Sequence, residues 1–80
     1  MTRIVFDYSK LFSRMKDYRY NQTQLASDTN IERVTLNAKL SHRSSFKQEE
    51  ILAIANVLDI TASKIGDYFF TPKERKTGQN

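Results

Sequence analysis

The 80-residue chain contains no cysteine and only one histidine, His42. A disulfide, a thiolate metal site and a cysteine nucleophile are therefore impossible, and a histidine-rich metal site is excluded as well. Glycine and proline are also scarce, with two residues and one residue respectively. This scarcity argues against the many tight turns of an all-β fold. We expect an all-α protein that holds no metal and needs no cofactor.

Long apolar runs are missing too. The longest apolar region, Ile51 to Leu58, is interrupted by Asn56 and is too short to cross a bilayer. The apolar stretch near the start, Ile4 to Phe6, is too short for a signal peptide. These features predict a soluble intracellular protein with no membrane partner.

The charge balance is basic, with 13 Lys and Arg against nine Asp and Glu, a net charge of +4. Such a balance favours a polyanionic partner but is also common on small soluble domains. The distribution is more telling, because the stretch from Arg33 to Gln48 carries four basic residues and no acidic one. No paired carboxylates stand beside a candidate nucleophile. We therefore expect neither an enzyme nor a small-molecule ligand.

Helical spacing of apolar residues predicts five helices in one domain over residues 1–70, followed by a flexible polar tail over residues 71–80. Asp7, Asn21 and Thr61 are expected to cap helices, and Ile51, Leu52, Ala55 and Leu58 to form one buried stripe. The expected helices span about 8–17, 22–29, 33–41 and 47–58, with a last one from Thr61 to between residues 68 and 70.

The stretch from Asn21 to Leu40 predicts a short helix, a tight turn and a second short helix. Asn30 stands where the turn needs a positive φ, which asparagine tolerates better than most residues. The residues expected to share the core of this corner are Leu25, Ala26, Ile31, Leu36 and Leu40. An outward face that is polar, basic and narrow suits the major groove of DNA. An ordinary helical bundle remains the alternative interpretation.

The chain resembles the helix-turn-helix regulators of the phage Cro and lambda-repressor type, the xenobiotic-response-element family. The resemblance spans Tyr8 to Phe70 and is carried by NQTQLA at 21–26, NIERVTLNAKL at 30–40 and EILAIANVLDITASKIGDYFF at 50–70. It implies a compact five-helix lambda-repressor-like DNA-binding domain whose helices 2 and 3 form the motif. It also implies the cytoplasm of a bacterial host as the location, in association with the nucleoid.

The predicted DNA contacts are made by the side chains that the predicted helix arrangement exposes. Arginine can bond guanine, asparagine can bond adenine, and apolar groups can touch a thymine methyl. Loop hydroxyls and cations, and a helix N-terminus, suit phosphate. The predicted base-reading residues are Arg33, Val34, Asn37 and Ala38. The predicted phosphate-binding residues are Gln22, Ser41, Arg43 and Lys47.

The predicted function is a sequence-specific transcriptional regulator, a Cro-like phage or prophage repressor that binds a palindromic double-stranded operator as a homodimer. The predicted dimer contact consists of Ile65, Tyr68, Phe69 and Phe70, although the same aromatic cluster can equally close the monomer core. The alternative function is a protein-interaction module, such as an antitoxin or an antagonist of another regulator. A large exposed apolar surface without a basic third helix would favour that alternative.

Overall fold

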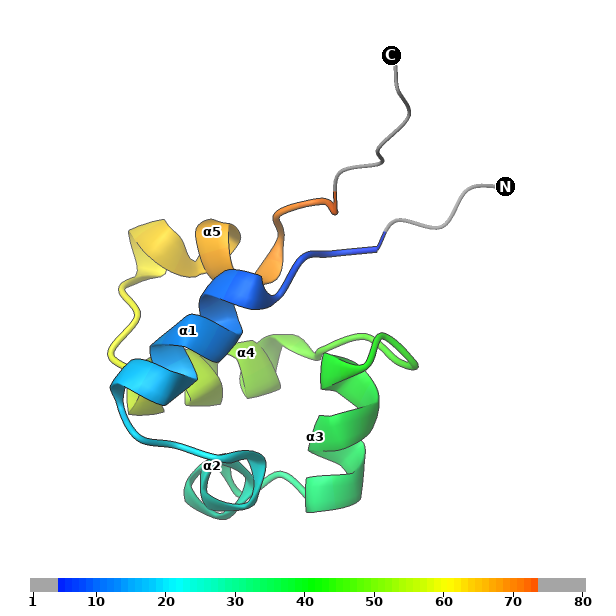
Figure 1. Ribbon diagram of the computed structural model, residues 1–80, viewed down its shortest axis with the longest axis vertical. Helices are drawn as coiled ribbons and strands as arrows, with labels where there is room; N and C mark the ends of the chain where they lie inside the picture. The colour runs from blue at the N-terminus through cyan, green and yellow to red at the C-terminus, as the bar shows by residue number, and fades with distance from the viewer. Residues whose placement is uncertain (1–4, 74–80) are drawn as a thin grey trace.

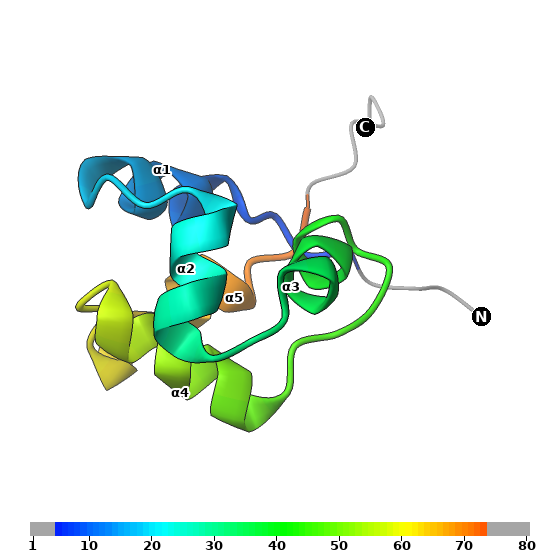
Figure 2. The same cartoon turned by 90° about the horizontal axis from the view of Figure 1, so that it is seen from below.

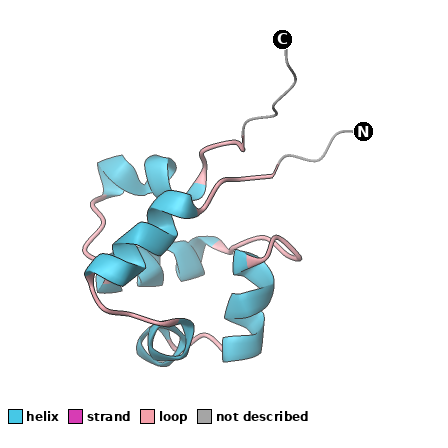
Figure 3. Ribbon diagram, viewed as in Figure 1, coloured by secondary structure: helices cyan, strands magenta, loops and turns pink. Residues whose placement is uncertain are grey.

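The computed structural model describes residues 5–73 as an assembly of short α-helices joined by short connections (Figures 1 and 3). The helices are α1 (Ser9–Asp17), α2 (Gln22–Thr29), α3 (Arg33–Leu40), α4 (Gln48–Val57) and α5 (Ile65–Phe69), with a 3₁₀ turn over Ala62–Lys64 before α5. The described part of the chain contains no strand, only an isolated antiparallel bridge between Phe6 and Pro72. The predicted all-α class with five helices is confirmed.

The core lies where α2 packs against α3 and α4, and where α5 packs against α1 and α4. Among the residues that the sequence predicts to be buried, Leu25, Leu36, Ile51 and Leu58 lie in this core. The full set of buried apolar residues is Tyr8, Leu11, Met15, Leu25, Ala26, Leu36, Leu40, Ile51, Ile54, Ala55, Leu58, Ile60 and Phe69.

The prediction that Leu52 belongs to the buried stripe of α4 is wrong. Leu52 is 61% exposed, and Ile54, which the prediction left out, is completely buried. Residues 51, 54, 55 and 58 follow the three- and four-residue steps of one helix face, whereas residue 52 lies about 100° away from residue 51 around the axis. No helix among residues 5–73 is both long and apolar enough to cross a membrane.

The two ends of the described chain run side by side (Figure 1). The N–H of Asp7 donates to the carbonyl of Thr71, and the N–H of Lys73 donates to the carbonyl of Val5, both at 2.7 Å. Backbone pairing therefore extends three residues past the predicted domain boundary at residue 70. Residues 74–80 of the predicted tail and residues 1–4 of the predicted domain lie outside the described residues.

Each of the helices α1 to α4 is followed by a residue other than glycine in the left-handed conformation. These residues are Arg19, Asn30, His42 and Asp59, with φ between 58° and 69°. The N–H of each donates three residues back, and the N–H of the next residue donates five residues back. This is the Schellman arrangement, which satisfies the last carbonyls of a helix. The positive φ expected at Asn30 is confirmed, whereas the other three positions were not anticipated.

We predict that Arg19→Gly stabilises the protein by about 0.5–1 kcal/mol. A left-handed residue with a Cβ costs about 1–2 kcal/mol, and the entropy lost by glycine on folding offsets part of that gain. Asn30→Gly is the matched control and should change the free energy of unfolding little, because asparagine already tolerates this conformation. Chemical denaturation measures both variants. An Arg19→Gly variant less stable than wild type would contradict the strain argument.

Candidate functional site

The corner between α2 and α3 depends on the residues that begin and end α2. The side chain of Asn21 accepts a hydrogen bond from the N–H of Gln24 at 2.7 Å, so the predicted cap of α2 is confirmed. Residues 30–32 connect the two helices, and Asn30 closes α2. Glu32 precedes α3 without capping it through its side chain. Figure 2 shows α2 and α3 crossing at a steep angle, so that one side of α3 faces away from the rest of the protein.

The outer side of α3 carries the predicted base-reading residues. Leu36 and Leu40 are buried, as expected, and fix the rotation of the helix. Arg33 and Asn37 are exposed, Val34 is 79% exposed, and Ala38 is half-buried. Arg33, Val34 and Asn37 line one shallow depression together. The exposed side of α3 is called the α3 face below.

Three of the predicted DNA-contacting side chains form a chain of hydrogen bonds across the α3 face. The side-chain amide of Asn37 donates to the side-chain carbonyl of Gln22 at 3.1 Å. The carbonyl of the same Asn37 side chain accepts from the guanidinium of Arg43 at 2.9 Å. The start of α2, the middle of α3 and the loop after α3 therefore meet at one residue. The sequence indicated each of these residues but not their connection.

The two other predicted phosphate-binding residues differ in their surroundings. The hydroxyl of Ser41 donates to the carbonyl of Asn37 at 2.6 Å. A hydroxyl has one proton, so Ser41 would have to leave this bond to donate to a phosphate. Lys47 is exposed at the N-cap position of α4. Lys47 is therefore better placed to meet an anion than Ser41.

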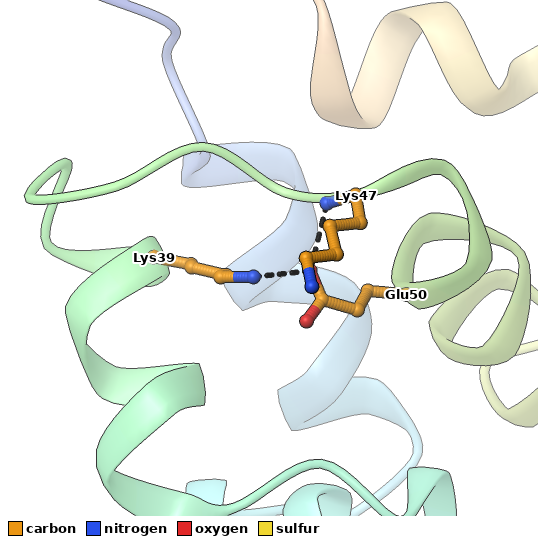
Figure 4. A network of polar contacts seen from close by, with 3 residues as sticks. All are labelled: Lys39, Lys47 and Glu50. Carbon is orange, nitrogen blue, oxygen red and sulfur yellow. Dashed lines mark hydrogen bonds and ion pairs between the residues drawn. The ribbon is translucent and has the colours of Figure 1, made fainter.

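Lys39 is buried and forms an ion pair with Glu50, with 2.5 Å between Nζ and Oε1 (Figure 4). The same carboxylate oxygen accepts the backbone N–H of Lys47 at 2.7 Å and thereby caps α4. The pair therefore links α3 to the first turn of α4. Because Lys39 is buried in this pair, only three of the four basic residues of the stretch 33–48 are exposed, namely Arg33, Arg43 and Lys47.

The environment of Glu50 has opposing effects on its pKa. Burial of the carboxylate is the largest single influence and raises the pKa. The hydrogen bonds from Lys39 and from the backbone of Lys47, with the charges of both lysines, outweigh burial and lower the pKa below its ordinary value. Glu50 is consequently ionised at neutral pH.

The loop after α3 is anchored on the N-terminal segment by aromatic contacts. The ring of His42 stacks on Tyr8 with 4.9 Å between centroids, and its Nε2 donates to the carbonyl of Phe6 at 2.6 Å. Phe46 packs edge-on against Tyr8 and against Phe69. His42 is half-buried, and its contacts with Tyr8 and Phe6 help to fix the course of the loop that carries Arg43.

The four predicted dimer residues differ in their exposure. Phe69 is only 1% exposed and packs in the monomer core, so its predicted intermolecular contact is wrong. Ile65 and Tyr68 are half-buried, and Phe70 is 50% exposed. Phe70 meets Phe6 edge-on with 5.6 Å between ring centroids. Residue 69 faces the core because α5 is a single short helix in which only one side reaches α1 and α4.

Sequence reasoning missed Glu50 and the link from Asn37 to Arg43. The signal for Glu50 was present, because Lys39 stands between the inward residues Leu36 and Leu40 on the same helix face, where an unpaired charge is costly. No group of three or more His, Asp and Glu side chains within residues 5–73 is arranged to hold a metal ion.

The chain belongs to the DUF739 family, described as a protein of unknown function, whose model matches residues 4–72. No curated protein matches the sequence.

We predict that Glu50→Gln destabilises the protein by about 3 kcal/mol at neutral pH. The substitution keeps an oxygen for the N–H of Lys47 but leaves the ammonium of Lys39 buried without its counter-ion. Because the pKa of Glu50 is lowered on folding, its contribution is present above the unfolded pKa near 4.5 and is lost as the pH falls through the folded value. Wild type should therefore lose more stability on acidification than Glu50→Gln.

Urea melts of wild type, Glu50→Gln, Lys39→Met and the double variant across a pH series test this ion pair. The two single effects should sum to more than the double effect, because the double variant leaves no buried charge. Additive effects, or parallel pH dependence of wild type and Glu50→Gln, would count against a stabilising pair.

Proposed function

We propose that the protein is a sequence-specific double-stranded DNA-binding transcriptional regulator that places α3 in the major groove. The observation that carries this proposal is the α3 face itself. An eight-residue helix, set off from the body of the protein by α2, exposes Arg33, Val34 and Asn37 together. Arginine, asparagine and an apolar group are the side chains that distinguish base edges in that groove.

The charges around the α3 face support an anionic partner. Arg33, Arg43 and Lys47 are exposed on or next to α3, and Lys39, the remaining base of this stretch, is paired internally with Glu50. Positive charge is thus concentrated on exposed side chains where a phosphate backbone would run beside the groove. Gln22, at the first position of α2, braces the face through Asn37 and retains its own amide N–H groups for a phosphate.

The sequence resemblance also supports the proposed DNA-binding function. The order of helices and the stretch 21–40 resemble Cro and lambda-repressor-type regulators, and the short connection between α2 and α3 with Asn30 left-handed suits a helix-turn-helix corner. We accordingly propose a repressor of the phage Cro kind, acting in a bacterial cytoplasm. Membership of a family of unknown function neither adds to this proposal nor opposes it.

We predict that Arg33→Ala weakens binding to the preferred duplex by about 1–3 kcal/mol and relaxes the preference at one base pair. Selection of bound duplexes from a random pool first identifies the preferred sequence. Lys47→Ala is the contrasting variant, because a lysine beside the groove should hold phosphate. It should weaken binding to all sequences equally and reduce the salt dependence by about one unit.

Titrations on the selected and a scrambled duplex, over a salt series, separate the two roles. An Arg33→Ala variant that loses affinity equally on both duplexes would refute base reading by Arg33. If the pool yields no enriched sequence, the proposed function itself fails.

We further propose that the protein binds as a homodimer on a two-fold symmetric operator. One short helix touches few base pairs, which discriminates poorly against the roughly 10⁶ or more competing sites of a genome. Two copies about one helical turn of DNA apart would double the sequence that is read. With Phe69 in the core, Phe70, which packs edge-on against the half-buried Phe6, is the exposed aromatic side chain that remains at the end of α5.

We predict that Phe70→Ala binds a half-operator as tightly as wild type but loses the advantage of the full operator. Phe70 is half exposed, so its removal should cost little folding stability, and a thermal melt checks that expectation. Gel-shift stoichiometry on both duplexes gives the answer. One wild-type molecule per full operator, with half-site affinity, would argue against a dimer, and an unchanged Phe70→Ala would place the contact elsewhere.

A further inference from the structure

Arg43 lies where the chain leaves α3, and its guanidinium turns back onto the α3 face. The backbone N–H of Arg43 closes the helix by donating to the carbonyl of Ala38 at 2.8 Å, and the side chain then donates to Asn37. The corresponding positions after the other three Schellman ends carry Tyr20, Ile31 and Ile60, all buried or half-buried. A position that elsewhere anchors the core therefore holds an exposed cation here.

Asn37 holds this guanidinium in place. Its carbonyl accepts from Arg43 at 2.9 Å while its amide group donates to Gln22 at 3.1 Å, so both ends of the Asn37 side chain are engaged. A free arginine side chain has many rotamers, and fixing one of them on binding costs free energy. Bracing the guanidinium in the unbound protein lowers that cost and favours a contact that needs one defined orientation.

The hydrogen-bonding groups left on this network are mostly donors. Arg43 offers its other guanidinium N–H groups, and Gln22 offers its side-chain NH₂ group. Duplex DNA presents two kinds of acceptor to such a surface, the phosphate oxygens and the N7 and O6 atoms of guanine in the major groove. A phosphate is held by a lysine ammonium, a point charge, as well as by the arginine fork, whereas the guanine edge requires two parallel N–H groups in one plane.

The position of the hydrogen-bonded network of Gln22, Asn37 and Arg43 favours guanine over phosphate as the partner of Arg43. The guanidinium of Arg43 is tied to Asn37, which shares a depression of the α3 face with Arg33 and Val34. Lys47, by contrast, is exposed at the N-cap position of the next helix, where orientation matters less for a phosphate contact.

We propose, on the basis of the proposed DNA-binding function, that Arg43 reads a guanine and that Asn37 positions its guanidinium. Arg43 is then a specificity-determining residue rather than the phosphate contact that the sequence indicated. Asn37 acts through Arg43 rather than by bonding adenine itself. Gln22 completes the brace from the start of α2.

The decisive variant is Arg43→Lys, which keeps the positive charge but loses the planar pair of donors. On the operator selected by wild type, it should weaken binding roughly 5- to 150-fold, the range of one good bidentate base contact. On a scrambled duplex, affinity and salt dependence should stay as in wild type. Lys64→Arg, a conservative exchange at an exposed residue of the 3₁₀ turn before α5, is the matched control and should change neither binding nor base preference.

The guanine itself is located by replacing each guanine of the operator in turn with an analogue that lacks the N7 acceptor. One replacement should weaken wild type and leave Arg43→Lys unaffected. Asn37→Ala should lose the preference for that same guanine, and combining it with Arg43→Lys should add little further loss. A purely structural role of Asn37 would instead lower thermal stability and weaken binding to all duplexes alike.

The outcomes distinguish a failure of the Arg43 assignment from a failure of the proposed DNA-binding function. If wild type binds a selected operator and Arg43→Lys binds it equally well, while Arg43→Ala weakens all duplexes and flattens the salt dependence, Arg43 holds a phosphate and this assignment is overturned. If Asn37→Ala loses preference at an adenine instead, Asn37 is the reader and the positioning role is refuted. If wild type enriches no duplex, the assignment fails together with the proposed function.

Discussion

The arrangement of this protein depends on how its short helices end. Helices α1 to α4 contain between eight and ten residues, fewer than the roughly 12–15 that an isolated helix needs in water. Each ends on a left-handed residue that satisfies the last carbonyls and reverses the chain. After three of these helices the next residue returns to the core, so each ending also adds to packing. After α3 it does not, and the chain places Arg43 on the surface instead.

The position of α3 rests on two different kinds of contact. Leu36 and Leu40 bury one side of the helix in the apolar core, which fixes its rotation. The ion pair between Lys39 and Glu50 connects its last turn to the first turn of α4. A buried pair needs close geometry to offset desolvation, so it restricts how α3 can shift relative to α4. The cap on Lys47 from the same carboxylate places an exposed cation near that junction.

These constraints explain why polar residues can act together on the α3 face. Gln22, Asn37 and Arg43 come from α2, α3 and the following loop, and they meet because the Asn30 turn and the ending of α3 direct the chain there. The loop itself is held by the stacking of His42 on Tyr8 and by its bond to Phe6. A rigid surface of this kind limits the free energy that would be lost in ordering side chains on a partner.

The sequence alone determined the helical class, the cap at Asn21, the left-handed turn at Asn30 and the burial of Leu25 and Leu36, because propensity, capping and periodicity act over a few residues. It also indicated each polar residue of the α3 face. Only the tertiary structure decided that Ile54 rather than Leu52 is buried, that Phe69 closes the core, and that Lys39 pairs with Glu50. It likewise decided that Asn37 joins Gln22 to Arg43. These outcomes depend on which helix sides meet and on contacts between residues distant in the chain, and local spacing carries no information about either.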